Sequence, residues 1–109
     1  MESLKKFIGK EIKVKTQKEL EDLIKKYDFK YAYLPEDLED FDELELVFDY
    51  TSSQDFHFTL TLFKKNIQRM MLVKIDKDNP EKIEPPTEEE IKIFLDKYGE
   101  RITDFLEKL

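Results

Sequence analysis

LELVFDYTSSQDFHFTLTLF, residues 44–63, alternates apolar and polar side chains on either side of the polar turn TSSQD. Successive residues of a β-strand point to opposite faces, so this period of two predicts two strands, each with one apolar face. A turn this short joins neighbouring antiparallel strands. The residues expected on the buried face are Leu44, Leu46, Phe48, Tyr50, Phe56, Phe58, Leu60 and Leu62. The stretch therefore predicts a β-hairpin that is covered on one side and faces water on the other.

A third strand is expected directly after the hairpin, in IQRMMLVKID, residues 67–76. The sequence KKN before it offers a tight turn in which Asn66 can adopt a positive φ. Three sequential strands joined by short turns form an antiparallel meander, which we place at residues 44–75.

Two further strands are expected upstream of the meander. In KEIKVK, residues 10–15, Ile12 and Val14 alternate with charged residues, which is typical of a half-buried strand. FKYAYL, residues 29–34, is a short apolar run that Pro35 stops, because proline cannot donate a hydrogen bond to a strand ladder. The sequence therefore predicts about five strands.

Two helices are expected in the N-terminal third of the chain. Ser3 is suited to cap a short helix, and Gly9 supplies the left-handed residue that ends it. Thr16 and Glu19 have the spacing of a capping box at the start of a second helix, residues 16–27. Apolar residues then recur at i, i+3, i+4 and i+7, so this helix has one apolar face.

A long C-terminal helix is expected after the turn-rich connector at residues 76–86. Thr87 and Glu90 again have capping-box spacing. The apolar phase runs straight through Gly99, which favours one helix with this glycine on an outer face over two helices. The apolar stripe consists of Ile91, Leu95, Tyr98, Ile102, Phe105 and Leu109. It can pack on the sheet, or it can form a coiled-coil-like seam with a second copy.

The order of these elements predicts an α+β fold. We expect a two-layer sandwich of about five mostly antiparallel strands, including the meander at 44–75, with an N-terminal helix and the long C-terminal helix packed on one face. A chain of 109 residues fits a single domain, residues 1–109, with one modest core. Its apolar content of 39% is too high for a disordered chain, although 41% of the residues are charged.

The composition limits the environment of the protein. The chain contains no cysteine, which excludes disulfides and thiolate chemistry and suits a reducing cytoplasm. No apolar stretch approaches the ~20 residues needed to span a bilayer, and no signal-peptide pattern is present, so we expect a cytoplasmic protein. The abundance of Lys and Glu is compatible with a thermophilic source or with an AT-rich genome such as that of a phage.

The charge is distributed unevenly along the chain. The formal net charge is −7, and residues 31–63 carry nine carboxylates without one lysine or arginine. Proteins bind nucleic acid by neutralising phosphates with Lys and Arg, and anionic membranes attract the same side chains. This distribution therefore argues against direct binding to nucleic acid or to a membrane.

The densest acidic segment is PEDLEDFDELELVFDY, residues 35–50. The segment either is a solvated loop whose apolar residues lie on the core or docks on a basic partner. In the second interpretation the carboxylates steer the partner and the apolar residues anchor it. The candidate partner-binding residues are Glu36, Asp37, Glu39, Asp40, Phe41, Asp42, Glu43, Glu45 and Asp49.

Candidate catalytic groups are few. His57 is the only histidine, with Asp49 or Asp55 as possible neighbours across the hairpin, but the sequence shows no nucleophile to complete a hydrolytic site. A Mg²⁺ site built from Asp49, Asp55 and Lys64 can be imagined, although such groups occur by chance in a chain this charged. Asp76 opens a segment that resembles a calcium loop but lacks its glycine and its final glutamate. Two glycines cannot build a phosphate-binding loop, so we expect no cofactor and no enzymatic activity.

These observations favour a non-enzymatic protein that docks a carboxylate-rich patch on a basic partner, such as a nuclease or a CRISPR effector. In size and charge the chain is similar to small acidic inhibitors, namely nuclease immunity proteins and virus-encoded anti-CRISPR proteins, although no family motif matches residue by residue. The first alternative is a homodimeric structural or assembly protein that associates through the C-terminal helix or an exposed strand. The second alternative is a small metal-dependent hydrolase.

Overall fold

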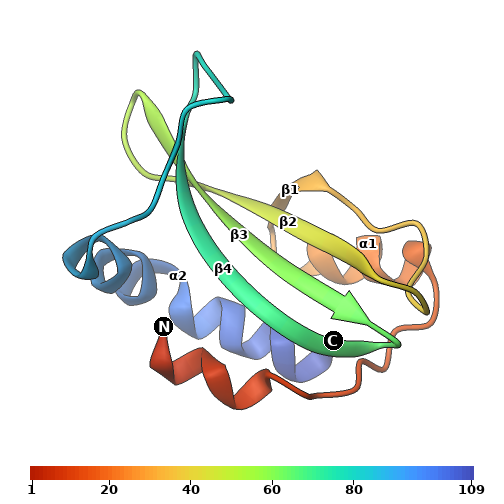
Figure 1. Cartoon of the computed structure of the whole chain (residues 1–109). Helices are drawn as coiled ribbons and strands as arrows, with labels where there is room; N and C mark the ends of the chain where they lie inside the picture. Colours follow the sequence, from red (N-terminus) through yellow and green to blue (C-terminus); the bar gives the residue numbers. More distant parts are fainter.

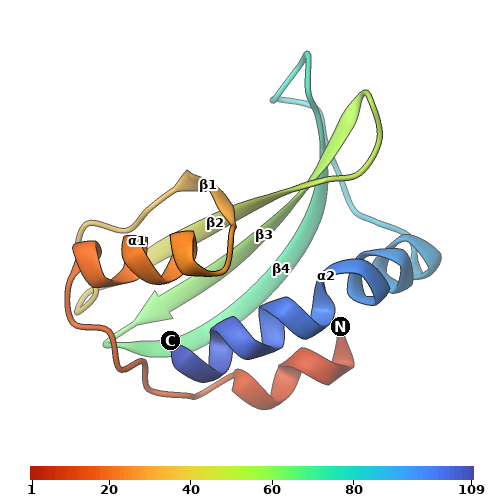
Figure 2. The same ribbon diagram turned by 180° about the vertical axis from the view of Figure 1, so that it is seen from behind.

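The computed structural model describes residues 1–109 and contains one five-stranded antiparallel sheet with helices on one face (Figures 1 and 2). The strands follow one another in space as in sequence, in the order β1 (Lys30–Tyr33), β2 (Asp42–Asp49), β3 (Gln54–Phe63), β4 (Asn66–Asp76) and β5 (Ile83–Glu84). The helices are a 3₁₀ helix, η1 (Glu2–Phe7), and two α-helices, α1 (Gln17–Lys26) and α2 (Glu88–Lys108). The predicted α+β fold is therefore confirmed.

The predicted meander is present as β2, β3 and β4. Leu46 lies opposite Phe58, which in turn lies opposite Leu72, so the buried faces of the three strands coincide. Every position that the alternation assigned to the buried face is buried except Tyr50, which is half-buried. The second turn differs from the prediction, because Lys64 and Lys65 adopt the positive φ values of 50° and 65°.

The core is centred on an aromatic cluster between α2 and the sheet. Phe94 of α2 is fully buried, and its ring centroid lies 5.1 Å from that of Phe48 and 5.2 Å from that of Phe56. The same helix also buries Ile102 and Phe105. The C-terminal stripe is thus used to cover the sheet of its own chain, and these side chains are not available for a dimer seam.

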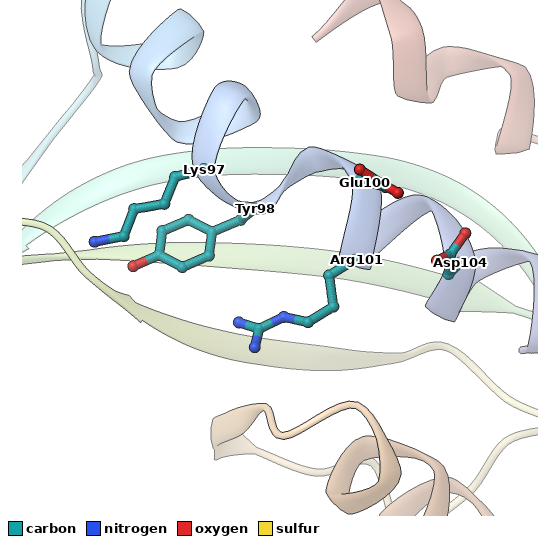
Figure 3. Close-up of a pocket in the computed structure, with 5 residues that line it drawn as sticks. All are labelled: Lys97, Tyr98, Glu100, Arg101 and Asp104. Atoms are coloured by element: carbon teal, nitrogen blue, oxygen red, sulfur yellow. The ribbon is translucent and has the colours of Figure 1, made fainter.

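Helix α2 is continuous through Gly99, as the apolar phase predicted. The Thr103 hydroxyl donates a hydrogen bond of 2.8 Å to the Gly99 carbonyl, an i−4 bond that often bends a helix. Figure 3 shows the helix axis changing direction near this point. The predicted stripe omitted Phe94, although it lies three residues after Ile91 and four before Tyr98 and so belongs to the same face.

Two expected N-terminal features are wrong. Ser3 does not cap the first helix, because Met1 is the N-cap and the serine lies inside η1. Residues 10–15 do not form a strand, although Ile12 and Val14 are buried as expected. The backbone N–H of Val14 donates to the Leu109 carbonyl at 3.1 Å, at the end of α2. The N–H of Ile12 donates to the Lys65 carbonyl at 2.8 Å, and Glu11 forms only an isolated antiparallel bridge with Asn66 at the start of β4. The fifth strand is instead β5, which lies in the predicted connector.

The starts of α1 and α2 use capping side chains in different ways. In α1, the Thr16 hydroxyl accepts from the Glu19 N–H, but the Glu19 carboxylate accepts from the Lys15 N–H. The predicted capping box of α1 is therefore only half formed. In α2 the box is complete, because Thr87 and Glu90 each accept a hydrogen bond from the other's backbone N–H.

Glu90 also ties the start of α2 to the sheet. Its carboxylate lies 3.0 Å from the ammonium of Lys74 on β4. The pKa of Glu90 is lowered to about 2, mainly by the hydrogen bond from the Thr87 N–H, with further hydrogen bonds from Lys74 and Tyr50 outweighing the opposing effect of burial. The same hydrogen bond to Glu90 raises the pKa of Tyr50. One carboxylate thus caps the helix and joins it to β4 and to the residue that follows β2.

The Glu90 contacts predict a pH-dependent loss of stability. A carboxylate whose pKa is lower in the folded chain stabilises it above the unfolded pKa near 4.5, and the effect fades as pH falls toward 2. We expect Glu90→Gln to lower the free energy of unfolding by about 1–2 kcal/mol at pH 7 and to have little effect near pH 2. Urea denaturation at several pH values measures this difference. The exposed neighbour Glu89→Gln is the control, and an equal loss in both variants would contradict the assignment.

Candidate functional site

The acidic loop, residues 34–41, joins β1 to β2 and holds one aromatic side chain in solvent. Leu38 is only 3% exposed and Pro35 is also buried, so the loop is attached to the body of the protein. Leu44, just inside β2, is fully buried. Phe41 is 64% exposed, the largest exposure among the exposed large hydrophobic residues. Of the three apolar residues set among the acids, the structure buries two and leaves Phe41 outside.

Asp42, at the start of β2, fixes the conformation of the acidic loop. Its carboxylate accepts hydrogen bonds from the N–H groups of Glu36 at 3.1 Å and Asp37 at 3.4 Å, and from that of Glu43 at 2.9 Å. A hydrogen bond to the same carboxylate raises the pKa of Tyr33. The backbone of the loop is therefore held closed by local hydrogen bonds.

An open groove of about 320 Å³ lies beside Phe41. Its lining residues are Tyr33, Phe41, Asp42, Glu43 and Glu45. Tyr33 and Phe41 are both exposed aromatic residues, and the other three residues are carboxylates. A cation over an aromatic face is attracted by the ring, and carboxylates form strong hydrogen bonds with ammonium and guanidinium groups. The groove thus has the chemistry to accept a lysine or arginine side chain.

The remaining candidate acids divide into neutralised and free groups. Glu39 forms an ion pair with Lys65 at 3.3 Å. Glu36, Asp37, Asp40 and Glu43 form no ion pair. The uncompensated negative charge of the site is therefore concentrated around Phe41.

Glu45 has a partner that the sequence did not reveal. Its carboxylate contacts Nδ1 of His57, whose side chain is 13% exposed. Asp49 and Asp55 were the possible neighbours of this histidine expected from the sequence. In the observed register His57 lies opposite Val47, which makes both Glu45 and Asp49 diagonal neighbours. Glu45 is the neighbour that contacts His57, whereas Asp49 binds Lys77 at 2.8 Å.

Asp49 does not join the other candidates. It ends β2, whereas Asp42 begins this strand, which separates them by roughly 24 Å at ~3.4 Å per residue. The imagined metal site also does not assemble, because Lys64 lies at the far end of β3 from Asp55 and the lysine found near Asp55 is Lys77, at 3.6 Å. No group of three or more potential metal ligands occurs in the structure.

Comparison with protein-family models, with curated proteins and with solved structures found no match to this chain. None of the helices has the length and apolar character required to cross a membrane. The function must therefore be inferred from the residues of the chain and their geometry.

The role of Asp42 can be tested by hydrogen exchange. We expect Asp42→Ala to increase the exchange rates of the Glu36 and Asp37 amides by about tenfold, because these N–H groups lose their acceptor. The exchange rates of the β3 amides should not change, because their acceptors are retained. NMR-detected exchange measures each amide separately. Asp40→Ala, which removes an exposed carboxylate that makes no hydrogen bond, is the control. Unchanged exchange in the Asp42 variant would show that the loop is held by other contacts.

Proposed function

We propose that the chain is a non-enzymatic binding protein that docks the acidic loop and its groove on a basic protein surface. The observation that carries this proposal is the exposure of Phe41 in a segment where Glu36, Asp37, Asp40 and Glu43 form no ion pair. A loop that served only as a solvated edge would gain free energy by burying this ring, as it buries Leu38. The side chain is instead placed where a partner can cover it.

Charge and apolar surface have separate roles in this docking. The free carboxylates create a negative potential that extends over about 8 Å at physiological salt and raises the rate of encounter with a basic partner. Each exposed carboxylate adds only modest affinity, because its charge is hydrated and is screened by salt. Phe41 supplies an aromatic anchor, the kind of residue that carries much of the binding energy in protein interfaces.

The hydrogen-bonded loop also reduces the cost of binding. Ordering a flexible segment opposes association, whereas a loop already closed by Asp42 presents its carboxylates without that loss. An arginine or lysine of the partner would enter the groove between Tyr33 and Phe41. Both aromatic faces and the adjacent carboxylates then contact one cationic side chain.

The partner class follows from this chemistry. Surfaces rich in arginine and lysine are typical of proteins that handle nucleic acid, where these side chains bind phosphates. Carboxylates in the same places would compete with the nucleic acid, so we propose an inhibitor of such a protein, for example a nuclease or a CRISPR effector. This activity would take place in the cytoplasm, or in the host cytoplasm if the chain is encoded by a virus.

A homodimer is the second candidate, and the helix-free face of the sheet favours it. Met71 and Ile83 are exposed, and the strand register places both on this face, away from the helices. An apolar interface there would persist at high salt, whereas acidic docking weakens as the charges are screened. Sedimentation across a range of salt concentrations separates the two candidates.

The docking proposal predicts the behaviour of a defined basic probe. We choose a peptide with four arginines, and its counterpart with citrulline at each arginine as the uncharged control. Removing charge with Glu36→Gln, Asp40→Asn and Glu43→Gln together should weaken binding of the arginine peptide at least about tenfold at low salt. These three side chains accept no hydrogen bond in the loop, so its conformation should be retained. Calorimetry at low and high salt measures the affinities.

The matched control neutralises Asp78, Glu81 and Asp96, which are exposed; the first two lie between β4 and β5, at the end of the sheet opposite the acidic loop. This variant has the same net charge as the first and should bind nearly as well as the wild-type chain. Phe41→Ala should weaken binding about fivefold with little change in its salt dependence, because it removes an apolar contact. No localised docking site exists if the two charge variants lose the same affinity for the arginine peptide, or if the citrulline peptide binds the wild-type chain as tightly as the arginine peptide does.

A further inference from the structure

Arg101 of α2 is held between two aromatic rings. It lies near the C-terminal end of β2, whereas the acidic loop precedes the start of this strand. The central carbon of its guanidinium lies 4.8 Å from the centroid of the Phe29 ring and 5.8 Å from that of the Tyr98 ring. Its Nε atom is buried and makes no hydrogen bond. Arg101 also forms no ion pair, which makes it different from Lys74 and Lys77, the lysines that join the sheet to nearby carboxylates.

A buried donor without an acceptor is costly, and native proteins contain few of them. The carboxylates nearby do not supply the missing acceptor. Glu100 and Asp104 share the cleft with Arg101 but form no hydrogen bond or ion pair with it. Asp49 is already bound to Lys77 at 2.8 Å. The Nε–H is shielded from the cleft, whereas the terminal N–H groups of the guanidinium are positioned by stacking and make no hydrogen bond within the chain.

Two adjoining clefts meet at Arg101 and Tyr98. The larger, of about 400 Å³, runs along α2, and Figure 3 shows its lining residues, with Lys97, Tyr98 and Arg101 extending toward the strands. The smaller, of about 140 Å³, lies between α2, the ends of β1 and β2, and the turn before β1. Its lining residues are Asp28, Phe29, Lys30, Val47, Phe48, Asp49, Tyr98 and Arg101. The guanidinium is therefore accessible from a cleft whose walls are partly aromatic.

Two lysines add positive charge to this region. Lys97 lies 5.3 Å from the centroid of the Tyr98 ring, and Lys30 lines the smaller cleft. The pKa of Asp49 is lowered chiefly by its hydrogen bond with Lys77, and Lys97 and Lys30 contribute to the same shift. The charges of both lysines thus act on the end of β2, beside Arg101.

We propose that Arg101 forms a binding site for a carboxylate group, which would lie in the plane of the guanidinium and accept two of its N–H groups. A planar guanidinium fixed by aromatic stacking matches a carboxylate in a bidentate geometry. The local charges are nearly balanced, because Asp28, Glu100 and Asp104 oppose Lys30, Lys97 and Arg101, while Asp49, which also lines the smaller cleft, is neutralised by Lys77. This balance favours a singly charged carboxylate over a phosphate dianion, which the three acids would repel.

The carboxylate can belong to a small free acid or to the C-terminus of a peptide. The site is separate from the acidic loop, since it lies at the opposite end of β2. The carboxylate site and the docking proposal can therefore be tested independently.

The test follows the Arg101 Nε–H signal of the intact chain by NMR. The probes are acetate, N-acetyl-dialanine with a free C-terminus, its C-terminal amide and inorganic phosphate, each at the same ionic strength set with chloride. We expect saturable shifts of the Arg101 Nε–H and of the Phe29 and Tyr98 ring signals with the carboxylates. Stronger binding of the dipeptide than of acetate would identify a peptide terminus as the source, and equal binding would identify a small acid.

Two variants complete the test. Arg101→Lys keeps the positive charge but removes the planar pair of N–H donors. Carboxylate binding should therefore weaken about tenfold, which corresponds to ~1.4 kcal/mol. Lys92→Gln, an exposed residue elsewhere on α2, should bind as the wild-type chain does. The proposal is overturned if Arg101 shows no saturable shift, or if the dipeptide amide causes the same shifts as the free acid. It is also overturned if phosphate binds as tightly as the carboxylates, or if Arg101→Lys retains the affinity of the wild-type chain. If that variant does not fold, the wild-type titrations decide alone.

Discussion

The packing of Phe94 against the sheet is the interaction on which the rest of the structure depends. Its ring contacts the rings of Phe48 and Phe56 and closes the space between α2 and the strands. The sheet has helices on one face only, so the apolar sides of three strands are buried in this one layer. Because the core is complete within one chain, the loops at both ends of β2 are free to carry charged groups that the fold itself does not need.

The strands of the meander could be predicted because their burial is encoded locally. Alternation with a period of two, interrupted by short polar turns, fixes which side chains face the core. Residues 10–15 have the same alternation, and Ile12 and Val14 are buried as it implies. The backbone of this segment, however, is shared between Leu109, at the other end of the chain, and an isolated bridge to the start of β4. A pattern of side chains does not reveal which backbone groups will meet.

The candidate site was only partly predictable for a similar reason. The acidic run is evident from the sequence, but the spacing of Leu38, Phe41 and Leu44 does not distinguish the one that stays outside. The loop is also closed by hydrogen bonds from the N–H groups of residues 36 and 37 to Asp42, contacts that the spacing of the apolar residues does not encode. The contact of Glu45 with His57 depends on strand register and on the choice between two diagonal neighbours. The sequence did not indicate a site at Arg101, since one arginine among other charged residues of a helix is typical of an ordinary solvent-exposed face.

The central claim is that the folded chain holds Phe41 away from its own core, and the free energy of unfolding of Phe41→Ala tests it most directly. Leu38→Ala in the same loop provides the scale, because truncating a buried leucine costs about 2–5 kcal/mol. We expect denaturation of Phe41→Ala to give a free energy within about 0.5 kcal/mol of the wild-type value, as for other exposed positions. A loss comparable to that of Leu38→Ala would show that Phe41 packs on the core in solution, and the ring would then not be available to a partner.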